Sequence, residues 1–196
     1  MEPEPLAGKN ELKPAPHTWV EQYGDALYRY AVTRIGDTVA CEDLVQETFL
    51  SALKGYKDFK GAASEKTWLF AILKNKIIDY YRKQAASRIE QGIPESSDEE
   101  WFDENGNWRP NMRPVDWQSG DSMVERKEFN RIIQLCKEKL KGVHQQVFTL
   151  KYLEDTEGDE ICKVLGLVPS NYWVMLHRIR LQMRACVEKN WLKEKY

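Results

Sequence analysis

The sequence predicts an all-α protein of two small helical bundles joined by a flexible acidic linker, the second bundle containing a helix-turn-helix. Apolar residues recur every three or four positions over residues 17–84 and again from residue 123, which is the spacing of amphipathic helices. Residues 85–122 lack a sustained period and are rich in Pro, Gly, Ser, Asn and acidic residues, as linkers are. Residues 1–16 are polar and proline-rich and are expected to form a loose tail. The predicted domains are therefore 17–84 and 123–196.

Composition and charge limit the class of protein. Of the 196 residues, 42% are hydrophobic and 31% are charged, and no apolar run has transmembrane length. The N-terminus lacks the apolar segment of a secretory signal, so a cytoplasmic protein is expected. The formal net charge of −2 is unevenly spread, because residues 85–130 carry five basic and eleven acidic side chains while residues 131–196 carry twelve basic and eight acidic ones. A negative middle segment thus lies between more positive parts.

Two helices are expected to open the first bundle. The first runs from His17 to Ile35, and Gly36-Asp37 end it. The second runs from about Val39 to Gly55, with Glu42 and Asp43 in its first turn, where acids complement the helix dipole. Its inner stripe is predicted to comprise Cys41, Val45, Phe49, Ala52 and Leu53, and its outer face Glu42, Asp43, Gln46, Glu47 and Leu50. Composition alone explains that acidic face as solvated surface.

A loop rich in lysine and aromatic residues, GYKDFKGAASEK, leads into a helix predicted over Lys66–Lys83. Leu69, Leu73 and Ile77 form its inner stripe. Five basic residues accompany a single acid, and they are interleaved with Trp and Tyr. This composition suits a surface that holds a phosphate backbone and stacks on unpaired bases. The alternative is an ordinary core helix with a solvated basic face.

The second bundle is predicted to hold four helices, ending with a helix-turn-helix. They cover Met123–Gly142, His144–Leu153, Glu157–Leu165 and Pro169–Trp191. Gly166 suits the tight turn, Leu167 the corner, and Pro169 the first position of the last helix. Val174, Leu176, Ile179 and Met183 are expected to pack inward. The opposite face carries Asn, His and Arg side chains, which can read base edges and hold phosphates, although an ordinary helical hairpin with a basic surface is the alternative.

The four cysteines, Cys41, Cys136, Cys162 and Cys186, are scattered through the helical patterns without a CxxC pair. Each has apolar neighbours in the sequence. We expect buried free thiols rather than a disulfide framework or a zinc site.

The motifs together resemble the extracytoplasmic-function sigma factors of bacterial RNA polymerase, the small two-domain class. The phrase CEDLVQETFLSALKGYKDFKG, followed by KTWLFAILKNKIIDYYRK, is similar to region two of that family. The phrase LKGVHQQVFTLKYLE, which leads into the helix-turn-helix, is similar to region four. The resemblance covers residues 17–84 and 123–190. It implies a sigma factor that binds core RNA polymerase, directs it to specific promoters and promotes melting of the −10 element.

The resemblance also implies roles for three sets of residues. Those implied to bind core polymerase are Asp43, Gln46, Glu47 and Phe49. Those implied to contact the −10 element, with a flipped base held in the loop, are Tyr56, Lys57, Phe59, Lys60, Lys66, Trp68, Lys74, Asn75 and Arg82. Those implied to contact the −35 element are Ser170, Asn171, Trp173, His177, Arg178, Arg180 and Arg184. Core polymerase, promoter DNA and an anti-sigma factor are the partners that the resemblance suggests.

Three positions depart from the family pattern. Trp173 stands where many members carry Lys or Arg, and one indole N–H cannot read guanine through two hydrogen bonds, so contact with sugar or a thymine methyl is expected. Val168 stands where a Ser or Thr cap is common, with Ser170 as a substitute. Gly158 is unusual because glycine weakens a helix interior by about 1 kcal/mol.

Two other classes of function are alternatives to a sigma factor. A helix-turn-helix regulator that binds duplex DNA without polymerase explains residues 158–184 equally well, but it explains neither the acidic face nor the basic aromatic helix. An enzyme is not expected, because His17, His144 and His177 are far apart and no Walker loop, nucleophile elbow or HExxH is present. For the same reason we expect no cofactor and no metal.

The linker is unusual in carrying aromatic residues, namely Trp101, Phe102, Trp108 and Trp117. Disordered linkers are poor in such residues, so we expect some of these rings to find a partner. A solvated spacer is the simplest interpretation. The alternatives are that the acidic segment lies in a basic polymerase channel, or that it covers the basic surfaces of the free protein.

Overall fold

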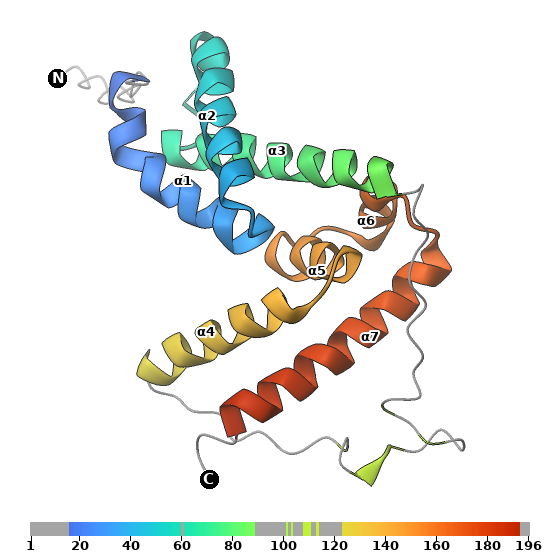
Figure 1. Ribbon diagram of the computed structural model, residues 1–196. Coiled ribbons are helices and arrows are strands. Elements are labelled where there is room, and N and C mark those ends of the chain that lie inside the picture. Colours follow the sequence, from blue (N-terminus) through green and yellow to red (C-terminus); the bar gives the residue numbers. More distant parts are fainter. Residues whose placement is uncertain are drawn as a thin grey trace, which may run out of the picture. The chain divides into compact units, whose positions relative to one another are not determined.

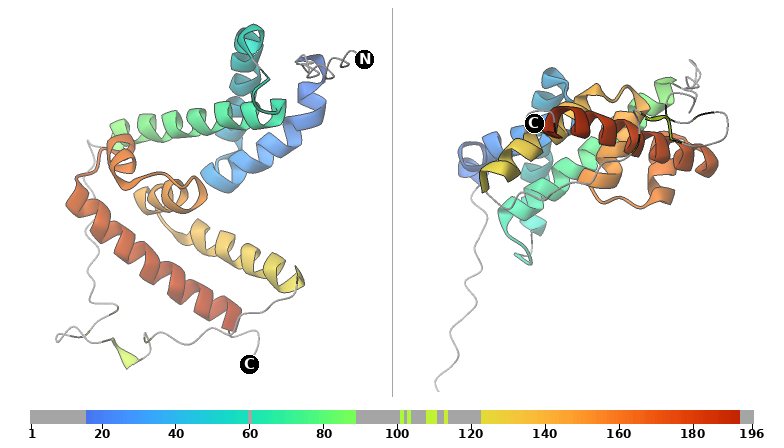
Figure 2. Two further views of the ribbon diagram at one scale, coloured as in Figure 1. Left: turned by 180° about the vertical axis from the view of Figure 1, so that it is seen from behind. Right: turned by 90° about the horizontal axis from the view of Figure 1, so that it is seen from below.

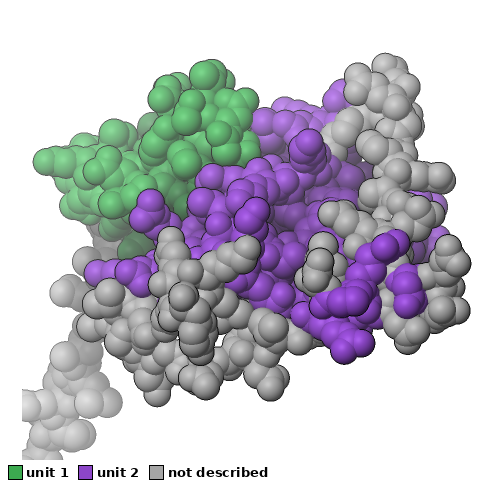
Figure 3. All heavy atoms as spheres, turned by 60° about the horizontal axis from the view of Figure 1, so that its bottom comes forward, with its two compact units in different colours: residues 1–77 green, residues 78–196 purple. Residues whose placement is uncertain are grey.

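The computed structural model describes residues 16–59, 61–88 and 123–192, together with residues 101, 103, 108–110 and 113. The chain forms two compact units, residues 1–77 and 78–196, and the boundary falls inside one long helix (Figure 3). All the long elements are helices, which confirms the all-α prediction (Figure 1). Lys60, Phe102 and Trp117 lie outside the described residues.

The described part of the first unit is built from two complete helices and the N-terminal part of a third. A single 3-10 turn at Pro16–Thr18 precedes α1 (Trp19–Ile35), which is followed by α2 (Thr38–Gly55). A second 3-10 turn, Tyr56–Asp58, begins the loop that leads to α3 (Glu65–Arg88), where the second unit takes over after Ile77. The predicted bounds agree within two residues, except that α3 continues five residues beyond Lys83.

The start of α2 differs from the expectation. The side chain of Asp37 caps the helix, because its Oδ1 accepts hydrogen bonds from the backbone N–H groups of Val39 (3.1 Å) and Ala40 (3.2 Å). The helix therefore begins at Thr38, and Glu42 and Asp43 lie beyond its first turn. The prediction that Glu42 and Asp43 complement the helix dipole is therefore wrong. The carboxylate of Asp37 does so instead.

Buried side chains from all three helices form the core of the first unit. The predicted stripe of α3 is confirmed, since Leu69, Leu73 and Ile77 are fully buried. They share the core with Trp19, Leu27, Ala31, Cys41 and Ala52. Leu53 was expected here but is exposed, and Leu44 and Thr48 are buried in α2 instead. The Thr48 hydroxyl donates to the Leu44 carbonyl at 2.7 Å, so its burial leaves no unpaired hydrogen-bonding group.

The second unit is arranged around α7 (Pro169–Val187), which contacts three other helices (Figures 1 and 2). These are α4 (Met123–Lys139), α5 (Val143–Phe148) and α6 (Gly158–Leu165). A π-helical turn, η5 (Thr149–Leu153), extends α5, and a second one, η6 (Glu188–Leu192), extends α7. The predicted elements are therefore present, although α4 ends earlier than expected.

The turn between α6 and α7 has the predicted chemistry. Gly166 ends α6 with a φ of 64°, a left-handed conformation that costs glycine little. The backbone N–H of Leu167 donates to the Cys162 carbonyl at 2.9 Å, and its side chain is buried at the corner. Pro169 is the first residue of α7, after Val168, whose side chain makes no capping hydrogen bond.

The buried stripe of α7 is partly as predicted. Leu176, Ile179 and Met183 are buried, as expected. Val174 is exposed, so its predicted inward position is wrong, and Tyr172 and Met175 pack inward instead. The stripe is therefore displaced by one or two positions at the N-terminal end of the helix.

Gly158 is the first residue of α6 rather than an interior residue, and it makes room for an aromatic ring. A Cβ at this position would lie 3.0 Å from the nearest ring carbon of Tyr172, a buried residue of α7. The glycine therefore lets α6 and the start of α7 pack closely, which explains its departure from the family pattern.

Two cysteines form a disulfide that was not expected. Cys136 of α4 and Cys186 of α7 are bonded across 50 residues of sequence, with 5.7 Å between their Cα atoms. The prediction of free thiols is wrong for this pair and confirmed for Cys41 and Cys162, which are free and buried. Periodicity placed each cysteine beside apolar positions, but it could not show that α4 and α7 are neighbours.

No helix in the described part of the chain is long and apolar enough to cross a membrane. The same residues contain no cluster of three or more His, Cys, Asp or Glu side chains that could hold a metal ion.

The disulfide gives a direct test of how the second unit is stabilised. Closing a loop of 50 residues restricts the unfolded chain and is expected to stabilise the fold by about 4 kcal/mol. Cys136→Ser should therefore lower the free energy of unfolding by about that amount, measured by denaturant titration of the oxidised chain. Dithiothreitol should destabilise the natural chain to the same degree and leave Cys136→Ser unchanged. Equal stability of the oxidised chain and the variant would contradict the bridge.

Candidate nucleic-acid interface

The outer face of α2 combines polar with apolar side chains. Asp43 and Gln46 are exposed there, as predicted. Around them, Val39 is 68% exposed, Leu50 57% and Leu53 45%. Exposed aliphatic side chains beside carboxylates are typical of protein-binding surfaces more than of solvated ones. The outer face predicted from the sequence does not include Val39 and Leu53. Leu53 was expected in the core instead.

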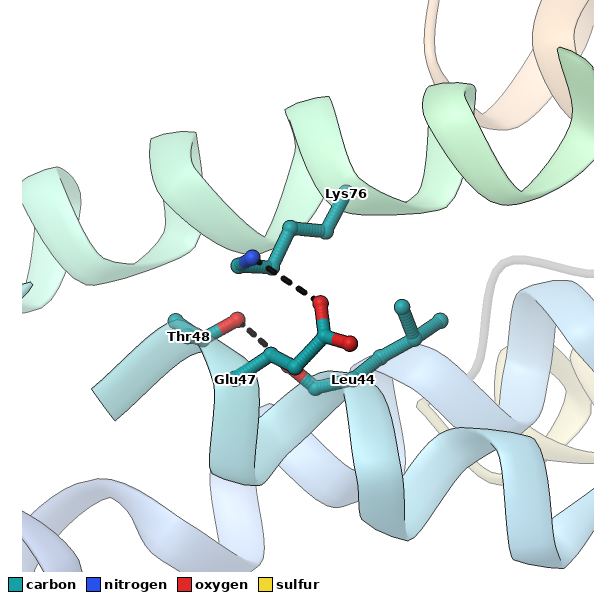
Figure 4. Close-up of polar contacts among 4 residues, drawn as sticks. All are labelled: Leu44, Glu47, Thr48 and Lys76. Carbon is teal, nitrogen blue, oxygen red and sulfur yellow. Dashed lines mark hydrogen bonds and ion pairs between the residues drawn. The ribbon is translucent and has the colours of Figure 1, made fainter. Parts of the chain in front are cut away.

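Glu47 lies at the edge of this face and is paired within the first unit. Its Oε2 lies 3.0 Å from the Nζ of Lys76 on α3 (Figure 4). The ion pair therefore links α2, which carries the residues predicted to bind polymerase, to the basic helix α3. Because both side chains are partly solvated, the pair contributes about 0–1 kcal/mol, and its main effect is to orient the two side chains.

Phe49 does not share the outer face with the other three residues predicted to bind polymerase. Its side chain is buried among the core residues of the first unit. Direct contact between Phe49 and a partner is therefore not supported by its position. It supports α2 from the inside while Asp43 and Gln46 remain exposed.

The lysine-aromatic loop rests on an aromatic cluster. The ring of Phe59 lies 4.9 Å from that of Trp68, which also makes an edge contact with Trp19 at 5.8 Å, both measured between centroids. Trp68 and Phe59 are partly buried, as is Tyr56. Lys57 and Lys66 are exposed. The loop thus presents its charges while its rings hold it to α3.

The outer side of α3 brings three predicted residues into one row. Trp68, Asn75 and Arg82 are spaced seven apart, which places them on the same side of a continuous helix. Asn75 and Arg82 are exposed, and Arg82 is ion-paired with Asp79. Lys74 is partly buried. The row supplies one amide and one guanidinium, groups that contact bases and phosphates.

The outer face of α7 presents most of the side chains predicted for it. Ser170, Asn171, Trp173, His177 and Arg180 are exposed, and Arg178 is partly buried. Arg180 is held in place, because its Nε donates to the hydroxyl of Tyr152 in η5 at 2.9 Å. This bond leaves the terminal guanidinium nitrogens available to a phosphate. The sequence did not reveal this contact of Tyr152, since 28 residues separate it from Arg180.

Arg184 does not belong to the open face of α7. Its guanidinium lies 4.3 Å from the ring centroid of Trp108, and its Nε lies 3.5 Å from Glu188. The side chain is mostly buried. Its predicted contact with DNA is therefore not supported, and it anchors the linker residue Trp108 by a cation–π contact.

Of the linker tryptophans within the described residues, Trp108 has a partner for its ring, as expected, and Trp101 is buried. Trp101 is buried, and its carbonyl accepts a hydrogen bond from the backbone N–H of Arg109 at 3.1 Å. Trp108 is partly buried under Arg184. Trp101 and Trp108 are thus not fully solvated, and the role of the linker as a whole stays a prediction.

His144 of α5 adds little positive charge to the α7 surface at neutral pH. Burial lowers the pKa of its imidazole below the ordinary value of about 6.5, and the nearby Arg178 lowers it further, against a hydrogen bond with Gln182 that raises it. The positive charge beside His144 therefore comes from the arginines of α7.

Comparison with known proteins gives the family. Residues 19–87 match the family model of sigma-70 region 2, and residues 130–183 match that of sigma-70 region 4. A probable RNA polymerase sigma factor of Haemophilus influenzae is 35% identical over 171 residues, which cover 87% of this chain and 88% of the relative. The ECF RNA polymerase sigma factor SigM of Bacillus subtilis is 27% identical over 165 residues, which cover 84% of this chain and 90% of SigM.

Among solved structures, the co-crystal structure of the sigma factor RpoE with the anti-sigma factor NepR from Bartonella quintana is similar to this chain. It is 17% identical with a TM-score of 0.42, and the match covers 89% of this chain and 97% of that one.

Both predicted bundles thus match sigma factor regions, in the predicted order. A duplex-binding regulator that acts without polymerase leaves the region 2 match without an explanation, and the family consists of initiation factors rather than enzymes. The chain belongs to the extracytoplasmic-function sigma factors of bacterial RNA polymerase, which bind the core enzyme and direct it to specific promoters.

Proposed function

We propose that this sigma factor uses three separate surfaces, one for core polymerase and one for each promoter element. Residues 17–84 are the proposed domain for core polymerase and the −10 element, and residues 123–196 that for the −35 element. The protein acts in the cytoplasm, where the polymerase is.

The outer face of α2 is the proposed surface for core polymerase. The observation that carries this assignment is the combination of Asp43 and Gln46 with the exposed Val39, Leu50 and Leu53. A docking surface needs apolar area for affinity and charge for orientation, and this face has both. Glu47 lies at its edge, held by Lys76.

The loop after α2 and the outer row of α3 are the proposed surface for the −10 element. Melting exposes unpaired bases, which gain free energy from stacking on rings and from contacts with polar side chains. Tyr56 and Phe59 supply rings, and Lys57 and Lys66 supply charge for the backbone. Asn75 and Arg82 continue the same surface along α3.

The N-terminal half of α7 is the proposed reader of the −35 element. Ser170, Asn171 and His177 are exposed near its start, where they can meet base edges in the major groove. Arg180 lies one turn further on, where phosphate contact is expected. The anchored Arg184 is left out of this surface.

Promoter selection is tested by transcription from whole genomic DNA of the source organism. Purified core polymerase with this protein should start transcripts at a small set of sites that share two upstream elements, and core alone should not. Sequencing the 5′ ends of the transcripts reads out both elements. Start sites that share no upstream sequence would contradict promoter recognition.

The polymerase surface is tested by charge reversal on α2. Asp43→Lys with Glu47→Lys should weaken core binding by about tenfold or more, because two attractive charges become repulsive. Fluorescence anisotropy of labelled full-length protein titrated with core polymerase measures the affinity.

Two matched variants control this test. Glu21→Lys with Asp25→Lys makes the same charge change on exposed positions of α1 and should keep the natural affinity. Lys76→Met breaks only the ion pair with Glu47 and should cost little. If the α1 and α2 double variants lose affinity equally, the effect is one of net charge and the α2 assignment fails.

A further inference from the structure

The start of α7 leaves three apolar side chains in solvent. Val168 is 55% exposed, Trp173 63% and Val174 44%. They lie within seven residues of one another, at the end of the helix that is proposed to meet duplex DNA. Isolated exposed apolar residues need no explanation, but a group of three at one helix end marks a contact surface.

Trp173 and Val174 flank the polar row of the same helix. Ser170 and His177 are seven residues apart and lie in line along the helix, and positions 173 and 174 fall on either side of that line. All four side chains are exposed, whereas Tyr172, Met175 and Leu176 are buried behind them. A partner that contacts Ser170 and His177 therefore also covers Trp173 and Val174.

The charge of α7 favours a nucleic acid as the partner of this surface. Its outer face carries the exposed Arg180 and the partly buried Arg178, and its 19 residues include no Asp or Glu. The N-terminus of the helix adds the positive end of its dipole. In the major groove of DNA, the apolar group available to such side chains is the C5-methyl group of thymine.

The indole of Trp173 is held from within the fold. Its ring contacts that of Tyr172 edge-on, with 5.2 Å between centroids and a 65° angle between the planes. Tyr172 is in turn buried against Gly158, where a Cβ would lie 3.0 Å from the ring. A packed tyrosine therefore restricts the orientation of an exposed tryptophan, as preorganised recognition requires.

We infer that Trp173 and Val174 are specificity-determining residues that read thymine methyl groups in the upstream promoter element. Trp173 has one hydrogen-bond donor and cannot read guanine as Lys or Arg does, so its selectivity comes from apolar contact. The upstream element of this sigma factor thus carries thymine at the base pairs that face these two side chains. This inference rests on the proposed role of α7.

The test uses deoxyuridine, which is thymidine without the methyl group. Full-length protein bound to core polymerase first selects duplexes from a pool in which the upstream and downstream elements are randomised. Each thymine of a selected duplex is then replaced singly by deoxyuridine, and the affinity of the holoenzyme is measured. The same series is run with Trp173→Ala and with Val174→Ala, and the thymines of the downstream element serve as the internal control.

For the natural chain, replacing one or two upstream thymines should weaken binding by about fourfold each, as expected for one methyl-sized group buried in the complex. In the variant that lacks the contacting side chain this loss should vanish, while the downstream element keeps its natural sensitivity to deoxyuridine. That sensitivity also shows that the variant is folded and bound to core.

Three results overturn the inference. If an upstream element is enriched but deoxyuridine does not change its affinity, the methyl contact does not exist, and the proposed function of α7 stands. Sensitivity that persists in both variants assigns the contact to other residues. If no upstream sequence is enriched at all, α7 does not read bases, and its proposed function fails together with the inference.

Discussion

Each compact unit depends on one long helix that must bury one stripe of side chains and leave the opposite stripe open. In the first unit, Leu69, Leu73 and Ile77 of α3 are fully buried, and in the second unit Leu176 and Ile179 of α7 are. These buried stripes fix the rotation of each helix about its axis. The polar side chains opposite them are therefore held outward by hydrophobic packing.

Contacts with neighbouring side chains then refine the exposed side. Lys76 orients Glu47, Tyr152 orients Arg180, and Tyr172 orients Trp173. Each pair is weak on its own, because exposed ion pairs and hydrogen bonds contribute little net stability. Their effect is to reduce the number of conformations of a side chain that has to meet a partner, which lowers the entropy lost on binding.

Periodicity predicted the helices and most of the buried positions, because burial follows the 3.6-residue repeat closely in their centres. It failed where that repeat is ambiguous, at Val174 and Leu53, which lie at the edge of a stripe. It could not pair Cys136 with Cys186 or Trp108 with Arg184, since these contacts depend on which helices are neighbours. The family resemblance supplied the polymerase face of α2, which composition alone described as solvated surface. The structure shows that the side chains of Phe49 and Arg184 are buried or mostly buried, whereas most of the other predicted site residues are exposed to a partner.

The most direct test of the account is hydroxyl-radical footprinting of the full-length protein in three states: free, bound to core polymerase, and bound to core polymerase on promoter DNA. Core binding alone should reduce the reactivity of Leu50 and Leu53, and promoter DNA should then reduce that of Trp173 and His177. Unchanged reactivity of Leu50 and Leu53 on core binding, or of Trp173 on promoter DNA, would contradict the claim that the outer faces of α2 and α7 are binding surfaces.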